Sequence, residues 1–503
     1  MRIATLMVAL IINWVAQSSG AESNRLNVLF IAVDDLRPEL GCYGNSVVKS
    51  PNIDRLAGQG IRFNRAYCQF ALCNPSRSSL LTGRRPETLK VYTLEAFVRD
   101  KNPDVTTLPQ LFKQNGYETR SFGKIFHVGN GNHDDAESWS VPPWHTARDD
   151  KSGTRSATSG GTASKANRKA GGPSDGKADE VDPDTPDHSG EPPFGDPNVP
   201  DEKLIDGQIA RHAVAALKEM GKQPFFLAVG FHRPHLPFVV PKKYWDYYQP
   251  STIPLATNDF LPDGAPAFAS NDSAELRRYM SIPTKGPIAR ETAKKLVHGY
   301  FASVSYVDAQ VGLLLAELDR LGLRSHTVVI LWGDHGYQLG EHGTWTKRTN
   351  WEMATRAPLI LSVPGQSSAG RATDALVEFV DIYPTLATLC DIKLPPELEG
   401  ISLSPLVKNP QLPWKSAAFS VYTKNVPEIG KVFGRAMRTD RFRFIRWTSP
   451  STNRAFCELY DHSIDPMENV NLADKPESRE TVERLSGMLK TGWRGALPDK
   501  QSR

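Results

Sequence analysis

The sequence predicts an α/β fold in which a large mixed β-sheet lies between helices, followed by a small antiparallel C-terminal subdomain. Three apolar runs have the near-continuous hydrophobicity of strands buried on both faces: NVLFIAV (residues 27–33), PFFLAVGFH (224–232) and TVVILWGDH (327–335). Segments with helical periodicity separate these runs. Alternation of strand and helix is the pattern of α/β domains, so the three strands are expected in one sheet.

The predicted elements follow in chain order. After the strand at residues 27–33, one helix begins at Pro51 and another covers residues 107–115. Longer helices are expected over residues 203–220 and 289–321, on either side of the second strand. After about Cys390 the pattern changes to short strand-like runs at 417–422, 442–447 and 459–461 and a closing helix at 476–493. We therefore predict a main domain over residues 22–390 and a subdomain over residues 391–503.

One internal segment has a different composition. Residues 148–200 are rich in Gly, Ser, Lys, Asp and Pro and contain almost no large apolar side chains. Such a segment cannot bury a core, so we predict a disordered surface insertion that is a target for proteases.

The N-terminus has the pattern of a signal peptide. Arg2 is followed by an apolar run over residues 3–15 and by the small residues Ser19-Gly20-Ala21. The run is shorter than the ~20 residues that a membrane span needs. We predict cleavage after Ala21, giving a signal peptide over residues 1–21, a secreted or periplasmic protein and no membrane span in the mature chain.

Composition narrows the function further. The 503 residues carry a formal charge of +4 and no long basic run, so nothing indicates a nucleic-acid partner. The five cysteines are an odd number for an exported protein, which leaves at least one unpaired or chemically altered. Cys73 is the candidate for that residue, and the pairing of the other four is left open: Cys42, Cys68, Cys390 and Cys457.

Acidic residues follow two of the predicted strands. Asp34-Asp35 ends the first strand and Asp334-His335 ends the third. Ligands of α/β sheets bind at the carboxyl ends of strands, so folding could bring these groups together. Carboxylates so close would raise one another's pKa without a cation, and an oxygen-rich site suits calcium or magnesium. Asp34-Asp35 alone could equally cap a turn, but the second pair favours a metal site.

Cys73 opens the segment Cys73-Asn74-Pro75-Ser76-Arg77, which becomes helical over the residues that follow. The thiol is thus expected near a helix N-terminus, where anionic chemistry is favoured. A lone cysteine is more often a small buried hydrophobe. Its context decides between the two interpretations.

That context resembles a known family. Cys73, Pro75, Ser76 and Arg77 match the C-x-P-S-R signature of type I sulfatases, whose cysteine is oxidised to formylglycine. The resemblance extends over residues 27–473, the insertion excluded, and its other motifs follow in the family's order: Asp34-Asp35, Gly123-Lys124, Asp334-His335-Gly336 and residues 339–343. The resemblance implies the alkaline-phosphatase-like sulfatase fold and, as partner, a formylglycine-generating or anaerobic sulfatase-maturing enzyme. It also implies one calcium ion, held by Asp34, Asp35, Cys73, Asp334 and His335.

Within the family the sequence is most similar to the iduronate-2-sulfatase branch. The similarity lies in residues 123–127, 229–235 and 345–347. His335 strengthens it, because many sulfatases have asparagine at that point. The resemblance implies hydrolysis of a sulfated carbohydrate, with 2-O-sulfated uronic acid in a glycosaminoglycan-like chain as the expected substrate and a sulfated algal polysaccharide as an alternative.

The resemblance also implies roles for individual side chains. An aldehyde hydrate offers one hydroxyl for attack on sulfur and a second that later expels sulfate. Calcium and Arg77 would lower the effective pKa of the nucleophile and neutralise charge. The remaining sulfate oxygens would be surrounded by Lys124, His127, His232 and Lys347. His232, with or without Lys347, is assigned as proton donor to the leaving alkoxide and His127 as the base, although the two histidines could exchange roles.

Other candidate residues and two rival functions are less favoured by the sequence. His235 is left out because turn packing competes evenly with a substrate contact, His342 is expected to make loop hydrogen bonds, and Asn52 is expected to cap a helix. A phosphate-ester hydrolase is disfavoured because only one metal cluster is evident. A sugar-binding protein without activity is disfavoured because the Cys73 motif is intact.

Overall fold

The computed structural model describes residues 25–130, 132–145, 188, 190–221 and 223–498. The predicted signal peptide and residues 148–187 of the predicted insertion lie outside the described residues. The end of that insertion, residues 190–200, is described and is part of the fold. Phe194–Gly195 forms strand β4 and pairs with β6 (Phe238–Val239). The expectation of disorder was therefore wrong for these last residues.

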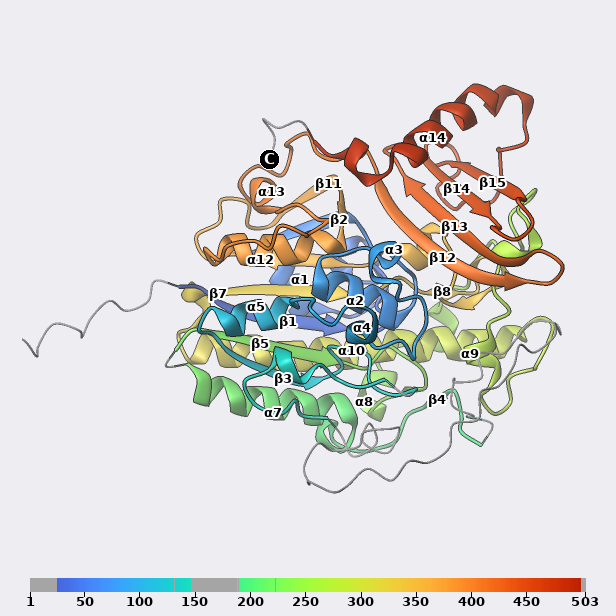
Figure 1. Cartoon of the computed structure of the whole chain (residues 1–503). Coiled ribbons are helices and arrows are strands. Elements are labelled where there is room, and N and C mark those ends of the chain that lie inside the picture. Colours follow the sequence, from blue (N-terminus) through green and yellow to red (C-terminus); the bar gives the residue numbers. More distant parts are fainter. Residues whose placement is uncertain (1–24, 131, 146–187, 189, 222, 499–503) are drawn as a thin grey trace, which may run out of the picture.

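A seven-stranded mixed sheet forms the centre of the molecule (Figure 1). The three predicted strands are β1 (Asn27–Val33), β5 (Phe225–Phe231) and β7 (Thr327–Gly333), and they lie side by side and parallel in the order β7-β1-β5. β3 (Glu118–Gly123) extends the sheet beyond β5. On the other side follow β10 (Leu359–Ser362), β2 (Ile61–Tyr67) and β11 (Arg371–Glu378), and β10 alone in this sheet runs antiparallel to its neighbours.

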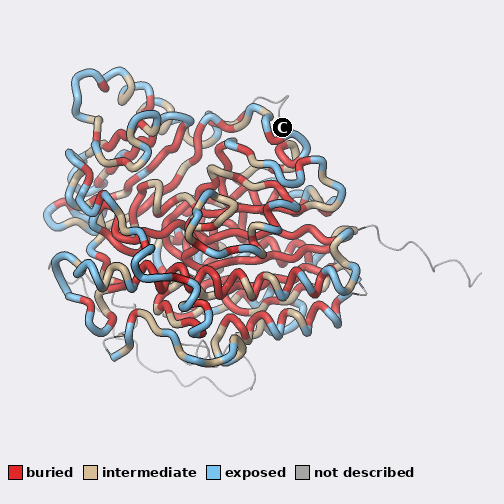
Figure 2. The backbone as a smooth tube through the Cα atoms, turned by 180° about the vertical axis from the view of Figure 1, so that it is seen from behind, coloured by how far each residue is buried: buried red, intermediate tan, exposed pale blue. Residues whose placement is uncertain are grey.

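Helices cover both faces of this sheet because alternate strand residues point to opposite sides. Leu29, Ile31 and Val33 of β1 belong to one apolar core, which includes residues of α1 (Pro51–Gln59), α7 (Ile205–Met220) and α10 (Arg290–Arg320). Val28, Phe30 and Ala32 belong to the core on the other face, with residues of α2 (Cys73–Thr82), α5 (Leu108–Gln114) and α12 (Ile382–Leu389). Figure 2 shows the buried residues concentrated in these central layers.

The predicted helices are confirmed within a few residues. α5 begins with a capping box, in which the Thr107 hydroxyl accepts from the Gln110 amide and the Gln110 side chain accepts from the Thr107 amide. Among the described residues, α10 is the helix with the length and hydropathy of a membrane span, but 78% of its most apolar window is buried inside the protein. It is the long core helix on one face of the sheet.

A four-stranded antiparallel sheet forms the C-terminal part, at the upper right of Figure 1. Its strands are β12 (Ala418–Val426), β13 (Gly430–Arg438), β14 (Phe442–Thr448) and β15 (Ala455–Asp461), and α14 (Arg479–Thr491) packs against it. β13 was not predicted. Leu403, Leu406 and Val407 pack in the core of the main sheet, so the small sheet itself begins later than residue 391, and the predicted domain boundary stays a prediction.

Two glycines let β3 and β5 approach closely where both strands end. A Cβ atom at Gly230 would lie 2.0 Å from the Lys124 carbonyl oxygen, and one at Gly123 would lie 2.2 Å from the Gly230 carbonyl oxygen. Gly123 also has φ +74°, which favours glycine. This contact fixes the backbone that carries Lys124 to the edge of the sheet.

Candidate active site

The carboxyl ends of β1 and β7 bring four predicted ligand residues together. Asp34, Asp35, Asp334 and His335 are all fully buried. The Asp35 amide donates to Asp334 Oδ1 at 3.0 Å, and His335 Nε2 lies 3.4 Å from Asp35 Oδ1 and 3.7 Å from Asp334 Oδ2. β1 and β7 are parallel neighbours, so their ends meet at one edge of the sheet.

This donor set fits a hard divalent cation. His335 Nδ1 lies 2.8 Å from the carbonyl oxygen of Gly336, so this nitrogen carries the proton and donates it. The lone pair of Nε2 is then free to face the carboxylates, as in a histidine that binds a metal. Buried carboxylate oxygens are the ligands that calcium and magnesium prefer. The cluster could therefore hold a metal ion.

Two cations balance the charge of Asp34. Arg77 is fully buried and donates from Nη2 to Asp34 Oδ1 at 2.9 Å and from Nε to Asp334 Oδ2 at 3.0 Å. Lys124, which directly follows β3, donates from Nζ to Asp34 Oδ2 at 2.5 Å. Burial would raise the pKa of Asp34, but Lys124 and Arg77 bring this pKa well below its ordinary value. Asp34 is thus a carboxylate over the whole physiological pH range.

Cys73 is the first residue of α2 and lies directly at this cluster. Its Sγ is 3.4 Å from His335 Nε2 and 4.0 Å from Asp35 Oδ1, and its side chain is buried. Burial, helped by the Asp34 carboxylate, raises the pKa of the Cys73 thiol well above its ordinary value. An unmodified thiol here would stay protonated and would be a poor nucleophile.

The remaining predicted residues differ in how closely they approach the cluster. Lys347 Nζ donates to Asp35 Oδ2 at 2.9 Å, so this cation lies beside Asp35. His127 is buried, and neither ring nitrogen has a hydrogen-bond partner among the described residues. Burial and the Lys124 charge lower the pKa of His127 well below its ordinary value, so its ring is neutral. His232 follows β5, and its backbone amide donates to Asp206 Oδ1 at 2.7 Å.

Two further residues lie at the site: His235, which was left out of the predicted catalytic set, and Glu275, which was not predicted. His235 Nε2 lies 3.1 Å from Glu275 Oε1 and 3.9 Å from Asp35 Oδ2. Glu275, in the short helix α9 (Ala274–Arg277), also accepts from Lys347 Nζ at 2.9 Å. The signal for His235 was its position three residues after His232 in the loop that follows β5. No sequence signal indicated Glu275, because it lies in a polar segment that is far along the chain from every motif.

The charges around His235 favour its protonated form. Burial and Lys347 lower the pKa of His235, but Asp35 and Glu275 outweigh them, and this pKa is raised above its ordinary value. Its Nδ1 lies 2.7 Å from the Leu236 carbonyl oxygen, so both ring nitrogens face acceptors. At the same site, the surrounding groups thus favour a proton on His235 and disfavour one on His127.

The site is a buried cluster of carboxylates and a histidine at the strand ends of a sheet between helices, and it is surrounded by Arg77, Lys124 and Lys347. This combination of fold and site defines a hydrolase of anionic esters with the alkaline-phosphatase-like fold. The family model described as Sulfatase matches residues 26–392, and that described as N-sulphoglucosamine sulphohydrolase, C-terminal, matches residues 340–493. The chain belongs to the sulfatase family and is a sulfuric ester hydrolase.

Similar sequences include two iduronate 2-sulfatases. That of Mus musculus is 35% identical over 91% of this chain and 93% of its own length, and that of Homo sapiens is 33% identical over 95% and 98%. An ulvan-active sulfatase of Formosa agariphila is 27% identical over 93% of this chain and 81% of its own length. The predicted resemblance to the iduronate-2-sulfatase branch is confirmed.

Solved structures confirm the fold. One is a protein in complex with its substrate D-glucosamine-2-N,6-O-disulfate, with a TM-score of 0.71, 21% identity and coverage of 95% of this chain and 99% of that one. A phosphonate monoester hydrolase of Agrobacterium radiobacter also has a TM-score of 0.71, with 21% identity and coverage of 94% and 96%. A 2-O GAG sulfatase has a TM-score of 0.69, with 22% identity and coverage of 95% and 94%.

Proposed function

We propose that this sulfatase removes the 2-O-sulfate of a uronic acid in a glycosaminoglycan-like polysaccharide, with Cys73 converted to formylglycine as the nucleophile. The observation that carries the proposal is the convergence of Cys73 with Asp35 and His335 in a buried site that Arg77, Lys124 and Lys347 surround. A neutral ester would not need three cations at the reacting atom. A sulfate ester needs them, because its oxygens carry the developing charge.

The side chains present fit the two groups that the family uses. Asp34, Asp35, Asp334 and His335, with the modified residue 73, would hold one calcium ion, which would supply positive charge to the nucleophile and to a sulfate oxygen. Formylglycine would supply a nucleophilic hydroxyl at a position where burial keeps a bare thiol protonated. Its formation would need a formylglycine-generating or anaerobic sulfatase-maturing enzyme.

The side chains of the protein would bind the sulfate and move the proton. Lys124 and Lys347 would hold sulfate oxygens on two sides of residue 73, because their ammonium groups lie on Asp34 and Asp35 respectively. His235 would donate a proton to the leaving sugar oxygen, since its charged form is favoured. This replaces the expected role of His232, three residues earlier. His127, neutral and without a hydrogen-bond partner among the described residues, would accept a proton.

The proposed substrate rests on the named relatives. Iduronate 2-sulfatases cover nearly the whole chain, and a neighbour in fold is described as a 2-O GAG sulfatase. A sulfated algal polysaccharide is the second candidate, because the ulvan-active sulfatase also covers most of the chain. The predicted signal peptide would place the enzyme outside the cytoplasm, where either polysaccharide is met.

The test is release of sulfate from a panel of disaccharides that differ in the sulfated position, with a Cys73→Ala control. The proposal predicts release from the 2-O-sulfated uronate and none from the control. Mass spectrometry of the peptide that contains residue 73 is the companion measurement. An unmodified thiol in fully active protein would contradict the mechanism, and preference for ulvan fragments would replace the substrate.

A further inference from the structure

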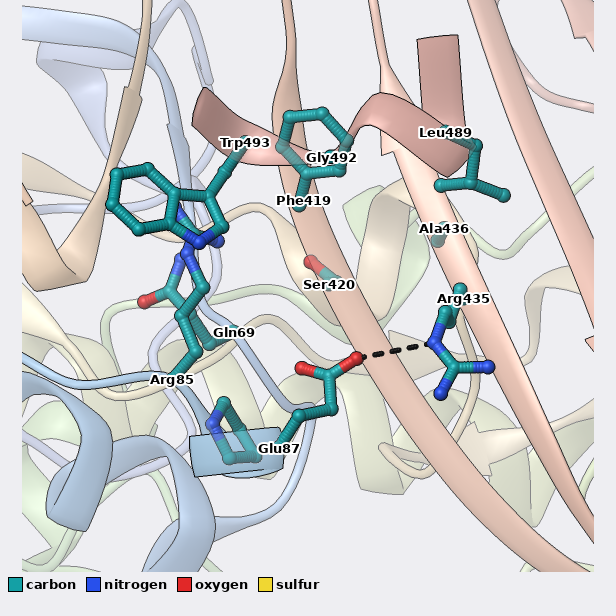
Figure 3. A pocket seen from close by; sticks show the side chains of 11 residues that line it. Gln69, Arg85, Glu87, Phe419, Ser420, Arg435, Ala436, Leu489, Gly492 and Trp493 are labelled. Atoms are coloured by element: carbon teal, nitrogen blue, oxygen red, sulfur yellow. Dashed lines mark ion pairs between the residues drawn. The ribbon is translucent and has the colours of Figure 1, made fainter. Parts of the chain in front are cut away.

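A cavity, the junction pocket, lies between the main domain and the C-terminal helix, outside the cluster around Cys73. Its volume is about 190 Å³, and it opens between α3 (Pro86–Leu89), strands β12 and β13, and the end of α14. Figure 3 shows it from close by, with Trp493 and Arg85 on one wall and the Glu87–Arg435 ion pair on the other. The volume is below the ~300 Å³ at which pockets for drug-sized ligands begin. It fits one small ring.

The walls of this junction pocket are mainly apolar. Phe419, Leu489 and Trp493 line it, and the guanidinium of Arg85 lies 5.2 Å from the centroid of the Trp493 ring. This cation–π contact holds the indole in place. Apolar walls of fixed shape suit the C–H surface of a sugar ring.

The few polar groups at the pocket include both donors and acceptors. Arg85 is 95% buried; its two terminal nitrogens donate to Glu378 at 2.8 Å, and its Nε, also buried, has no hydrogen-bond partner among the described residues. On the facing wall Glu87 Oε1 lies 3.3 Å from Arg435 Nε. A simple anion would be repelled by Glu87, whereas a hydroxylated ring can both accept from the part-exposed Arg435 and donate to Glu87.

A series of contacts connects the junction pocket with the site of Cys73. Tyr92 packs against the apolar cluster that contains Cys73, and its ring lies 5.9 Å from that of Phe433 on β13. The guanidinium of Arg435 lies 5.8 Å from the same Phe433 ring and pairs with Glu87 of the pocket. These side chains form a line of contacts from the cluster of Cys73 to the pocket, and this line is the route that the proposal below assigns to the glycan.

We propose that the junction pocket is a subsite for an uncleaved sugar unit of the polysaccharide. This inference rests on the proposed function, because the sugar belongs to the same chain as the sulfate that is removed. The subsite would make the enzyme favour longer chains over disaccharides. It would not touch the reacting atoms.

The experiment compares the disaccharide and the tetrasaccharide of one 2-O-sulfated uronate polymer. For the wild-type enzyme the KM of the tetrasaccharide should be about tenfold lower than that of the disaccharide. Glu87→Gln and Trp493→Ala should each remove most of that difference and leave kcat and the disaccharide KM unchanged. Glu87 is a part-exposed residue in a surface ion pair, so its substitution tests the pocket without a risk to folding. Lys490→Ala, on the exposed side of α14, is the matched control and should change neither constant.

Binding of the tetrasaccharide to Cys73→Ala protein, measured by calorimetry with and without Glu87→Gln, tests the subsite independently of turnover. Binding that weakens severalfold on Glu87→Gln supports the proposal. Equal KM for both substrates, or unchanged affinity in the variants, overturns it. A wild-type enzyme that hydrolyses neither substrate contradicts the proposed function, and the calorimetry then still decides whether the pocket binds the glycan.

Discussion

His235 Nε2 lies 3.1 Å from Glu275 Oε1, although forty residues and no shared motif separate the two in the chain. The contact places a histidine whose protonated form is favoured beside Lys347 and Asp35. His127, on the loop after β3, is instead held neutral by burial and Lys124. One protonated and one neutral histidine at a site are what proton donation and acceptance require.

We predict that His235→Gln lowers kcat by about 10²-fold or more, because a positioned general acid contributes ~10²–10⁴-fold. Steady-state release of sulfate from the 2-O-sulfated disaccharide measures it. His326→Gln, at an exposed histidine just before β7, should leave kcat unchanged. If His232→Gln is the more damaging substitution, the assignment of the proton donor returns to His232.

The pH dependence of kcat should follow from the charge on His235. Its pKa is raised in the folded protein, so the protonated form persists above the pH at which a free histidine loses its proton, and activity should fall as pH rises through that raised pKa. Glu275→Gln removes one of the charges that raise it. We expect the alkaline limb of the pH–rate profile to move to lower pH in this variant. Glu291→Gln, on the exposed start of α10, is the control and should keep the wild-type profile.

Removal of the proposed calcium ion should both inactivate and destabilise the enzyme. Three carboxylates are buried together here, and burial raises the pKa of Asp35 in the absence of an ion. A cation that binds only the folded state raises Tm by mass action. We expect a chelator to abolish sulfate release and lower Tm, and added calcium to restore both. Asp35→Asn should lose the calcium-dependent rise in Tm, and a variant that keeps it would exclude Asp35 as a ligand.

Glu378 connects the main sheet to the C-terminal sheet and should control stability. It accepts from Arg85 at 2.8 Å, from Lys415 at 2.8 Å and from the backbone amide of Phe419 at 2.9 Å. Replacement of a buried ion-pair partner leaves the other charges uncompensated, so Glu378→Gln should lower the free energy of unfolding by about 3 kcal/mol. Denaturant unfolding measures it. Glu291→Gln, a surface ion pair, should change it by less than about 0.5 kcal/mol.

The pKa of Glu378 should also make the stability of the folded protein depend on pH. Burial would raise the pKa of Glu378, but Arg85 and Lys415 lower it from 4.5 to about 2. A carboxyl group with a lowered pKa stabilises the folded state above the pKa of the unfolded chain and loses this effect as pH falls towards its folded value. Thermal unfolding should therefore show a loss of Tm between about pH 4.5 and 2 that is smaller in Glu378→Gln. Equal pH dependence of the two proteins would contradict this role.

Much of the fold followed from the sequence because its signals are local. The runs at β1, β5 and β7 are apolar on both faces, and only strands between two helical layers need that. β13 escaped prediction because Gly430, Lys431 and Arg435 interrupt its apolar pattern, and its partners β12 and β14 complete it. Its stability as a strand comes from pairing, which is a tertiary property.

The sequence by itself determined the class of chemistry. The segment from Cys73 to Arg77 is a short motif, and so is each pair of polar residues that ends a strand. Such motifs indicate a chemistry through residues that are neighbours in the chain. Only the tertiary structure decided which further groups meet them: His235 Nε2 lies 3.9 Å from Asp35 Oδ2 and 3.1 Å from Glu275 Oε1. The physical reason is that backbone direction at a strand end is set locally, whereas contacts between loops depend on how distant elements pack.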